Sequence, residues 1–323
     1  MEKRPFIETV DLKKYFHTPK GELHAIDGIN LKIYQGETLG VVGESGCGKS
    51  TLGRLVLRLL EATEGQILYE GEDILSKNKG ELFEARKRMQ MIFQDPYACL
   101  NPRLTVSEII AEPLIVCRTV KGKHAVQRRV EELMETVGLA QRFINAYPHE
   151  MDGGRRQRVG IARALALEPS FVVCDEPVSA LDVSIQAQIL NLMMDLQEEK
   201  KLTYMFITHD LSVVKHISNH IAVMYLGKCV ELAPTEELFK NPRHPYTKAL
   251  LAAIPKASLE CRNREIEVLS GEVVSPINPK PGCRFYARCP YRADLCLGSD
   301  LPLTEIGEDH FVSCRLYDEE GYQ

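Results

Sequence analysis

A glycine-rich loop that begins at Gly43 constrains this sequence more than any other stretch. Residues 43–51, GESGCGKST, match the phosphate-binding pattern G-x-x-x-x-G-K-[ST] without a mismatch. An apolar run over 38–42 predicts a buried strand that enters the loop, and apolar residues at helical spacing after Lys49 predict a helix that leaves it. Because strand, loop and helix agree, a chance match in a glycine-rich turn is the weaker interpretation.

The loop predicts a site for a nucleotide triphosphate and its magnesium ion. Backbone N–H groups of such a loop and of the first helical turn point at phosphate oxygens, and glycines permit the tight curvature. We expect Lys49 to reach the β- and γ-phosphates and the Ser50 hydroxyl to bind Mg²⁺. The loop residues expected to contact the nucleotide are Ser45, Gly46, Cys47, Gly48, Lys49, Ser50 and Thr51.

Composition argues against several other classes of protein. The 323 residues are 44% hydrophobic and 26% charged, as in ordinary globular proteins, and the net charge of −5 gives no reason to expect nucleic-acid binding. No apolar run reaches the ~18 residues of a membrane helix, and the N-terminus leads into no signal-peptide core. We therefore expect a soluble, cytosolic chain whose work at any membrane would depend on other, spanning subunits.

Strands that alternate with helices predict an α/β fold with a covered parallel sheet. Residues 6–36 alternate apolar and polar positions, which predicts antiparallel strands joined by a turn near 19–21. Further strands are expected at 66–76, 89–93, 170–174 and 202–208, and a hairpin at 221–233. Helices are expected within 105–139 and at 153–166, 184–196, 235–239 and 246–254. After Pro255 prolines and cysteines accumulate, so we place a domain boundary near 255–265.

Candidate catalytic residues follow the predicted strands, where a parallel sheet gathers its ligand-binding groups. Asp175 is typical of a carboxylate held near Mg²⁺, and Glu176 beside it can polarise an attacking water as a general base. Gln94 and His209 follow two other strands and could help to position and neutralise the phosphate. The alternatives are a salt-bridged surface carboxylate for Glu176 and a satisfied core histidine for His209.

Taken in order, these motifs resemble those of ABC-transporter ATPases over roughly residues 6–255. The resemblance rests on the phosphate loop, Gln94, Gly153-Gly154 before a helix, the strand and carboxylates of 171–176, the sequence SALD at 179–182, and His209. It implies a P-loop NTPase of the ABC ATPase type, with a mixed-sheet core, an antiparallel β subdomain and a helical subdomain at about 97–165. This ATPase domain would cover residues 1–255.

In that family two such domains face head to tail, and each ATP lies between one subunit's phosphate loop and the other's Gly-Gly signature. The resemblance implies that Asp152, Gly153 and Gly154 face the partner's nucleotide and that Asp182 contacts the opposite subunit. It further implies that Gln94 senses Mg²⁺ and the membrane subunits.

Two aromatic residues end the first predicted strand. Tyr15 and Phe16 are explained equally well as core aromatics or as candidates for stacking on a nucleotide base. The resemblance favours Phe16, rather than Tyr15, as the residue that stacks on adenine.

Two further segments narrow the resemblance to one branch. Residues 94–103, QDPYACLNPR, and 244–251, HPYTKALL, are similar to the oligopeptide, dipeptide and nickel importers. This branch implies an ATPase on the cytoplasmic face of a bacterial or archaeal membrane, paired with a second ATPase subunit and two transmembrane permease subunits. An extracytoplasmic peptide-binding receptor would be an indirect partner. The alternatives are a nickel or glutathione importer, or a soluble ABC ATPase outside transport.

Four of the ten cysteines are clustered near the C-terminus, at Cys283, Cys289, Cys296 and Cys314. In a cytosolic chain such a cluster favours metal over disulfides, and four thiolates suit zinc or an iron–sulfur cluster. The wide gaps differ from the close C-x₂-C pairs of most zinc ribbons, and the branch resemblance favours a 4Fe-4S cluster in a C-terminal module at 256–323. Buried cysteines without a ligand are the alternative. A structural role is favoured over redox sensing because so small a module has little core.

The signature departs from the family pattern. Most relatives have L-S-G-G-Q, whereas residues 151–155 are MDGGR. The family serine donates a hydrogen bond to the γ-phosphate, but an ionised Asp152 can only accept one, and its charge 4 Å from a phosphate would cost about 4 kcal/mol at a dielectric near 20. We therefore expect a heterodimer in which the site that uses Glu176 hydrolyses ATP and the site that uses Asp152 is slow. The alternative is that Asp152 only caps the helix and Arg155 contacts the phosphate.

Overall fold

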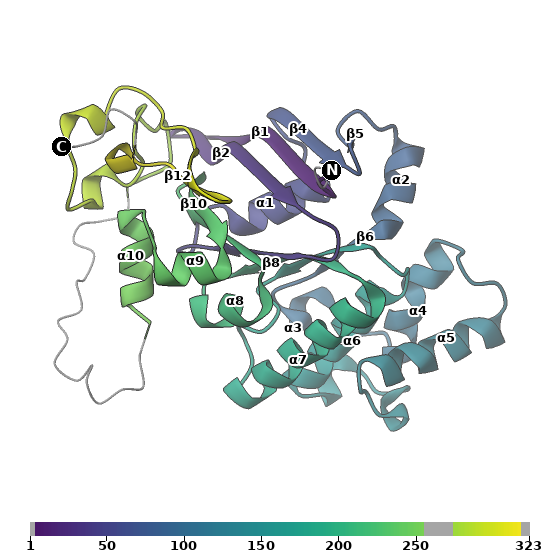
Figure 1. Ribbon diagram of the computed structural model, residues 1–323. Helices are drawn as coiled ribbons and strands as arrows, with labels where there is room; N and C mark the ends of the chain where they lie inside the picture. Colours follow the sequence, from purple (N-terminus) through teal and green to yellow (C-terminus); the bar gives the residue numbers. More distant parts are fainter. Residues whose placement is uncertain (1–3, 255–273, 318–323) are drawn as a thin grey trace, which may run out of the picture. The chain divides into compact units, whose positions relative to one another are not determined.

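Residues 4–254 and 274–317 are described by the computed structural model of the protein (Figure 1). They divide into two units. The terminal unit takes residues 1–33, 38–75 and 208–323, and the middle unit takes residues 34–37 and 76–207. The domain boundary expected near 255–265 falls outside the described residues, as does the start of the expected C-terminal module.

The terminal unit opens with an antiparallel sheet in the order β2-β1-β4-β5. The strands are β1 (Ile7–Thr18), β2 (Gly21–Ile33), β4 (Glu64–Tyr69) and β5 (Glu72–Asp73). β1 pairs antiparallel with both β2 and β4, and alternate apolar side chains such as Ile7, Ile29 and Ile67 are buried. The antiparallel strands and the turn near 19–21 were both predicted.

A second set of strands in the terminal unit follows the order β11-β12-β10-β9-β3. Its members are β3 (Thr38–Val42), β9 (His220–Tyr225), β10 (Lys228–Pro234), β11 (Thr304–Gly307) and β12 (His310–Val312). β3 and β9 are parallel, and the predicted hairpin joins β9 to β10. All five residues of β3 are buried, as expected for a parallel strand covered on both faces.

In the described part of the terminal unit there are four α-helices: α1 (Lys49–Val56), α8 (Leu211–Ile217), α9 (Thr235–Lys240) and α10 (Pro245–Ala252). α8 packs on β3, and α9 packs on β9 and β10. α8 was not predicted from the sequence. Neither were β11 and β12, because they are short and lie in a proline-rich stretch.

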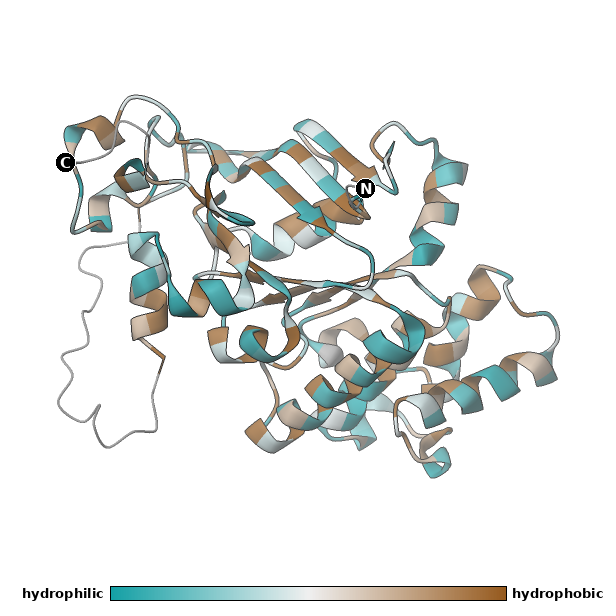
Figure 2. Cartoon of the chain, viewed as in Figure 1, coloured by the Kyte–Doolittle hydropathy of each residue, from teal (hydrophilic) through white to brown (hydrophobic). Residues whose placement is uncertain are grey.

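The middle unit is built around three parallel strands in the order β8-β7-β6. These are β6 (Met89–Ile92), β7 (Phe171–Asp175) and β8 (Thr203–Thr208), and every residue of β7 and β8 is buried. Figure 2 shows β8 as largely apolar, whereas α5 carries many hydrophilic residues. The parallel strands expected from the recurring strand–helix–strand order are confirmed.

Six α-helices of the middle unit are described: α2 (Lys79–Arg88), α3 (Pro96–Cys99), α4 (Val106–Val116), α5 (Lys123–Thr136), α6 (Gly153–Leu165) and α7 (Val183–Lys200). α4, α5 and α6 pack on one another. The helical stretch expected over 105–139 is broken near Arg118, which has a positive φ of 52°. α2 was not predicted because Ala85 is its one buried residue and gives no apolar stripe. Along the described stretches, no helix is both long and apolar enough to cross a membrane.

Candidate functional site

The phosphate loop connects β3 to α1 in the terminal unit. A Cβ added at Gly43 would lie 2.2 Å from the carbonyl oxygen of Met224, and one at Gly48 would lie 2.3 Å from that of Ala25. Both glycines also have positive φ angles, 153° and 106°, so a larger residue at either position would be strained and would clash. The curvature of the loop therefore depends on glycine at its start and its end.

Lys49 is held inside this loop. Its side chain is buried, and Nζ donates to the carbonyl oxygens of Gly43 at 2.8 Å and Glu44 at 3.1 Å. No side chain caps α1, and no acidic residue lies in its first turn. A fixed ammonium and an uncapped helix start favour an anion at this position.

The two aromatic candidates of β1 have different surroundings. The Tyr15 hydroxyl donates to Asp27 Oδ1 at 2.7 Å, and its ring stacks on His24 with centroids 3.9 Å apart. Phe16 is half-buried, with the Lys14 ammonium 5.1 Å from its ring centroid. Tyr15 is thus engaged within the unit, and Phe16 as the residue that stacks on adenine stays a prediction.

In the middle unit, two of the predicted catalytic residues lie together. Glu176 directly follows β7, and its Oε2 accepts a hydrogen bond from Gln94 Nε2 at 3.0 Å. Glu176 has a positive φ of 45°, and its backbone N–H donates to Ile207 O at 2.9 Å. A left-handed backbone costs a non-glycine residue about 1–3 kcal/mol and is commonly found at functional sites. Asp175, the last residue of β7, is buried.

His209 belongs to the terminal unit and directly follows β8. Its side chain is exposed, so it is not a core histidine. The next residue, Asp210, caps α8 by accepting the Ser212 N–H at 2.7 Å. The cap fixes the backbone beside His209 and leaves its ring at the surface.

The signature residues lie at the start of α6. Asp152 is its N-cap, as predicted, and Oδ1 accepts the Arg155 N–H at 2.8 Å. The Asp152 Oδ2 also lies 3.2 Å from Arg155 Nη1, and both side chains are exposed by more than 40%. The Arg155 guanidinium stacks over Phe143 at 4.7 Å. The carboxylate is therefore both a helix cap and one member of an exposed ion pair.

Asp182 is the N-cap of α7, at an exposed position. Its side chain makes no capping hydrogen bond, and the next residue, Val183, is 81% exposed. Asp182 as a contact of the opposite subunit therefore stays a prediction.

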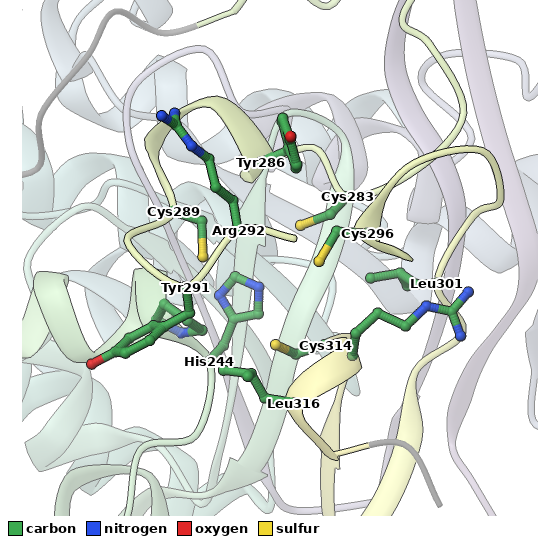
Figure 3. A pocket seen from close by; sticks show the side chains of 12 residues that line it. His244, Cys283, Tyr286, Cys289, Tyr291, Arg292, Cys296, Leu301, Cys314 and Leu316 are labelled. Atoms are coloured by element: carbon green, nitrogen blue, oxygen red, sulfur yellow. The ribbon is translucent and has the colours of Figure 1, made fainter. Parts of the chain in front are cut away.

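The four clustered cysteines line one cavity in the terminal unit (Figure 3). Cys283, Cys289, Cys296 and Cys314 surround it, together with the ring of His244. Burial raises the pKa of the Cys283 thiol to about 12, so without a ligand this thiol stays protonated at neutral pH. Across residues 4–254 and 274–317, no group of three or more His, Cys, Asp or Glu side chains is placed so that it could hold a metal ion.

The lining of this cavity fits an anionic cluster bound through thiolates. Arg292 and Arg315 line it, and no acidic side chain does. A four-iron cluster separates its ligating sulfurs more than one tetrahedral zinc ion does, because the iron–sulfide core lies between them. The 4Fe-4S ligand set of the four cysteines stays a prediction.

Comparison with known proteins identifies the class first. Residues 26–179 match the ABC transporter family, so the phosphate loop and the signature helix belong to an ATP-hydrolysing ABC cassette. Residues 230–296 match the C-terminal region of oligopeptide/dipeptide transporters. The chain belongs to the ATP-binding proteins of the oligopeptide/dipeptide branch of ABC transporters.

Individual relatives are similar in sequence to this chain over nearly its whole length. The oligopeptide transport ATP-binding protein OppF of Salmonella typhimurium is 50% identical over 328 residues, with 98% of each chain covered. The dipeptide transport ATP-binding protein DppF of Haemophilus influenzae is 47% identical over 319 residues, with 97% of each covered. Among solved structures, a dimeric ATP-binding cassette bound to ADP and Pi has a TM-score of 0.66 at 29% identity, covering 71% of this chain and 98% of that one.

Proposed function

We propose that this chain is the energy-coupling ATPase subunit of an importer for dipeptides or oligopeptides. The observation that carries the proposal is the joining of an ABC cassette to the C-terminal region of oligopeptide/dipeptide transporters in one chain. Relatives named for dipeptide and oligopeptide transport, similar over nearly their full length, support the same substrate class.

In the proposed site, Lys49 and the loop residues Ser45–Thr51 bind the triphosphate, and Ser50, Gln94 and Asp175 hold Mg²⁺. Glu176 accepts a proton from the attacking water, because its carboxylate can act as a general base and is oriented by the hydrogen bond from Gln94 at 3.0 Å. His209 contacts the γ-phosphate. Phe16 stacks on adenine.

The proposed partners are a second, different ATPase subunit and two transmembrane permeases at the cytoplasmic face of the membrane. Asp152, Gly153, Gly154 and Asp182 face the other ATPase. Three large apolar side chains of the middle unit, Tyr97, Ile115 and Val116, are exposed near the ends of α3 and α4.

The heterodimer has unequal sites in this proposal. The Asp152 carboxylate would repel the γ-phosphate, although the ion pair with Arg155 offsets part of the repulsion. Both groups are well exposed, so water screens the pair and the offset is incomplete. The site formed with this signature therefore hydrolyses ATP slowly, and the site formed with Glu176 does most of the work.

We further propose that Cys283, Cys289, Cys296 and Cys314 hold a 4Fe-4S cluster that stabilises the C-terminal part of the terminal unit. When bound, the cluster would be ligated by the four thiolates and would tie together segments that share little apolar core. Two cationic residues, Arg292 and Arg315, line the cavity, but the Arg292 guanidinium points away from the four sulfurs in Figure 3, and that of Arg315 donates to Ser299.

The deciding experiment is uptake and ATP hydrolysis by the assembled importer with candidate receptor–ligand pairs. Peptides should stimulate both activities, and Lys49→Ala should abolish both. Stimulation by nickel chelates or glutathione, but not by peptides, would assign another cargo. Recovery of the chain with ribosomes or DNA, and without membrane subunits, would remove it from transport altogether.

A further inference from the structure

The cysteine-bearing segment reaches the phosphate loop through one side chain, Arg288. This residue ends a 3₁₀ turn, Tyr286–Arg288, and directly precedes Cys289. Its Nη1 lies 2.9 and 3.1 Å from the two carboxylate oxygens of Glu44, the second residue of the phosphate loop. Only 9% of the Arg288 side chain and 31% of the Glu44 side chain are exposed, so water screens this pair less than an ordinary surface pair.

A buried aromatic cluster holds both partners in place. The rings of Tyr225, Tyr246 and Phe285 contact one another with centroids 4.7 to 5.5 Å apart. Arg288 Nη1 donates to the Tyr225 hydroxyl at 3.4 Å, and the Glu44 backbone N–H donates to the Tyr246 hydroxyl at 2.9 Å. The arginine and the backbone of the loop are therefore positioned by the same three rings.

The charge of Glu44 explains what this arrangement contributes. The Glu44 carbonyl oxygen already accepts a hydrogen bond from Lys49, so its side chain belongs to the loop that surrounds the phosphates. An uncompensated carboxylate within about 8 Å of a triphosphate would weaken nucleotide binding roughly tenfold or more at an effective dielectric of 20. Arg288 supplies the compensating charge at a fixed position.

We propose that Arg288 is a positioning residue of the nucleotide site. It neutralises Glu44 and holds the first turn of the phosphate loop, so that the cysteine-bearing segment contributes to ATP affinity. The inference rests on the proposed nucleotide site and extends it to a part of the chain outside the ATP-binding motifs. The alternative is that the ion pair only attaches the cysteine-bearing segment to the phosphate loop and does not affect nucleotide binding.

The test is the equilibrium Kd of a fluorescent ATP analogue for the full-length chain at low salt. Arg288→Met, which keeps most of the apolar stem, should weaken binding roughly tenfold. Glu44→Gln should tighten it by a similar factor, roughly tenfold, because it removes the same unit charge and leaves Arg288 positive. The double variant Glu44→Gln/Arg288→Met should return to within about threefold of wild type, because no charge is left uncompensated. Lys280→Met, which removes an exposed cation from the same segment, should leave the Kd unchanged.

Two outcomes overturn the proposal: a Kd within twofold of wild type for Arg288→Met, or a double variant as weak as Arg288→Met alone. Arg288→Lys keeps the charge and should bind within about threefold of wild type, which covers the case in which Arg288→Met does not fold. Lys49→Ala separates this inference from the proposed function. If wild type binds the analogue and Lys49→Ala does not, the nucleotide site stands whatever Arg288 does.

Discussion

The Glu231 carboxylate lies 2.8 Å from His310 Nε2, and neither side chain is more than 3% exposed. The backbone N–H groups of Arg243 and His244 donate to the same carboxylate at 2.7 and 2.8 Å. Burial alone would raise the pKa of Glu231, but these donors outweigh it and keep the pKa below its usual value. One buried carboxylate thus joins β10, β12 and the start of α10.

Replacing Glu231 by glutamine should lower the free energy of unfolding by about 2–4 kcal/mol, because a neutral amide cannot satisfy donors that surround a buried charge. Urea denaturation at neutral pH measures the loss. Glu236→Gln, at an exposed position in the first turn of α9, is the matched control and should change stability by about 0.5 kcal/mol or less. Equal effects of the two variants would contradict a special role for the buried pair.

Glu176→Gln should lower ATP hydrolysis by about 100-fold or more and leave ATP binding within a few-fold of wild type, since the amide keeps the shape but loses the base. Steady-state hydrolysis and nucleotide binding by the assembled importer check this. Glu199→Gln, an exposed change on α7, should leave both quantities unchanged. Residual hydrolysis above one tenth of wild type would assign the base elsewhere.

Three substitutions at Asp152 separate its capping role from its charge. Alanine removes the cap of α6 and should cost about 1 kcal/mol of stability, whereas serine and asparagine keep a capping oxygen and should cost little. If the carboxylate repels the γ-phosphate, Asp152→Ser and Asp152→Asn should both raise turnover at the slow site. Nucleotide retention at that site is the second measurement. A gain with neither variant would favour the simple capping role.

The lowered pKa of Asp27 predicts that the folded protein loses stability at acidic pH. Burial would raise its pKa, but the hydrogen bond from Tyr15 and the charges of Lys228 and Arg284 outweigh it and bring the pKa to about 2, from 3.8. Because the folded-state pKa is the lower one, the stabilisation is present above about pH 4 and is lost as the pH falls towards 2. It amounts to about 2 kcal/mol, of which about half should be gone at pH 3. Urea denaturation of wild type and Asp27→Asn at pH 5 and pH 3 should show the difference between them shrinking by roughly 1 kcal/mol.

Iron content tests the cysteine cavity without reference to activity. Protein purified without oxygen should carry about four irons per chain and absorb broadly in the visible range. Cys289→Ser should lose both signals and unfold at lower temperature, whereas Cys117→Ser, at the end of α4, should keep them. One zinc per chain and no visible absorption would show that the cysteines hold a zinc ion and not an iron–sulfur cluster.

The sequence predicted most of the fold because its signals were local and strong. The phosphate loop follows a strand with five buried residues, and the signature helix begins at a residue that caps well, Asp152. α2 was not predicted because its start is marked by a capping box of Asn78 and Glu81 and not by an apolar stripe. β11 and β12 were not predicted because they are strands of only four and three residues. β12 gains its order from pairing with β10, a contact that no local pattern reveals, and β11 pairs in turn with β12.

The residues of the candidate site also fall into those that the sequence predicts and those that it does not. Gln94 and Glu176 could be named from strand ends, and their hydrogen bond follows from parallel neighbours. Arg288 could not, because it lies 244 residues from Glu44 and belongs to no nucleotide-binding motif. The one available signal was the unexplained carboxylate in the phosphate loop, which requires a cation from some other part of the fold.

The terminal unit is assembled from both ends of the chain, with the middle unit inserted between them. On the ribosome, β3 and the phosphate loop emerge long before β9, their parallel neighbour, and before β12 completes the strand set. Pairing across so many residues is slow, and the apolar strand that waits for it is a natural substrate for chaperones. Premature termination near the C-terminus should therefore yield a protein that aggregates, rather than a shorter working ATPase.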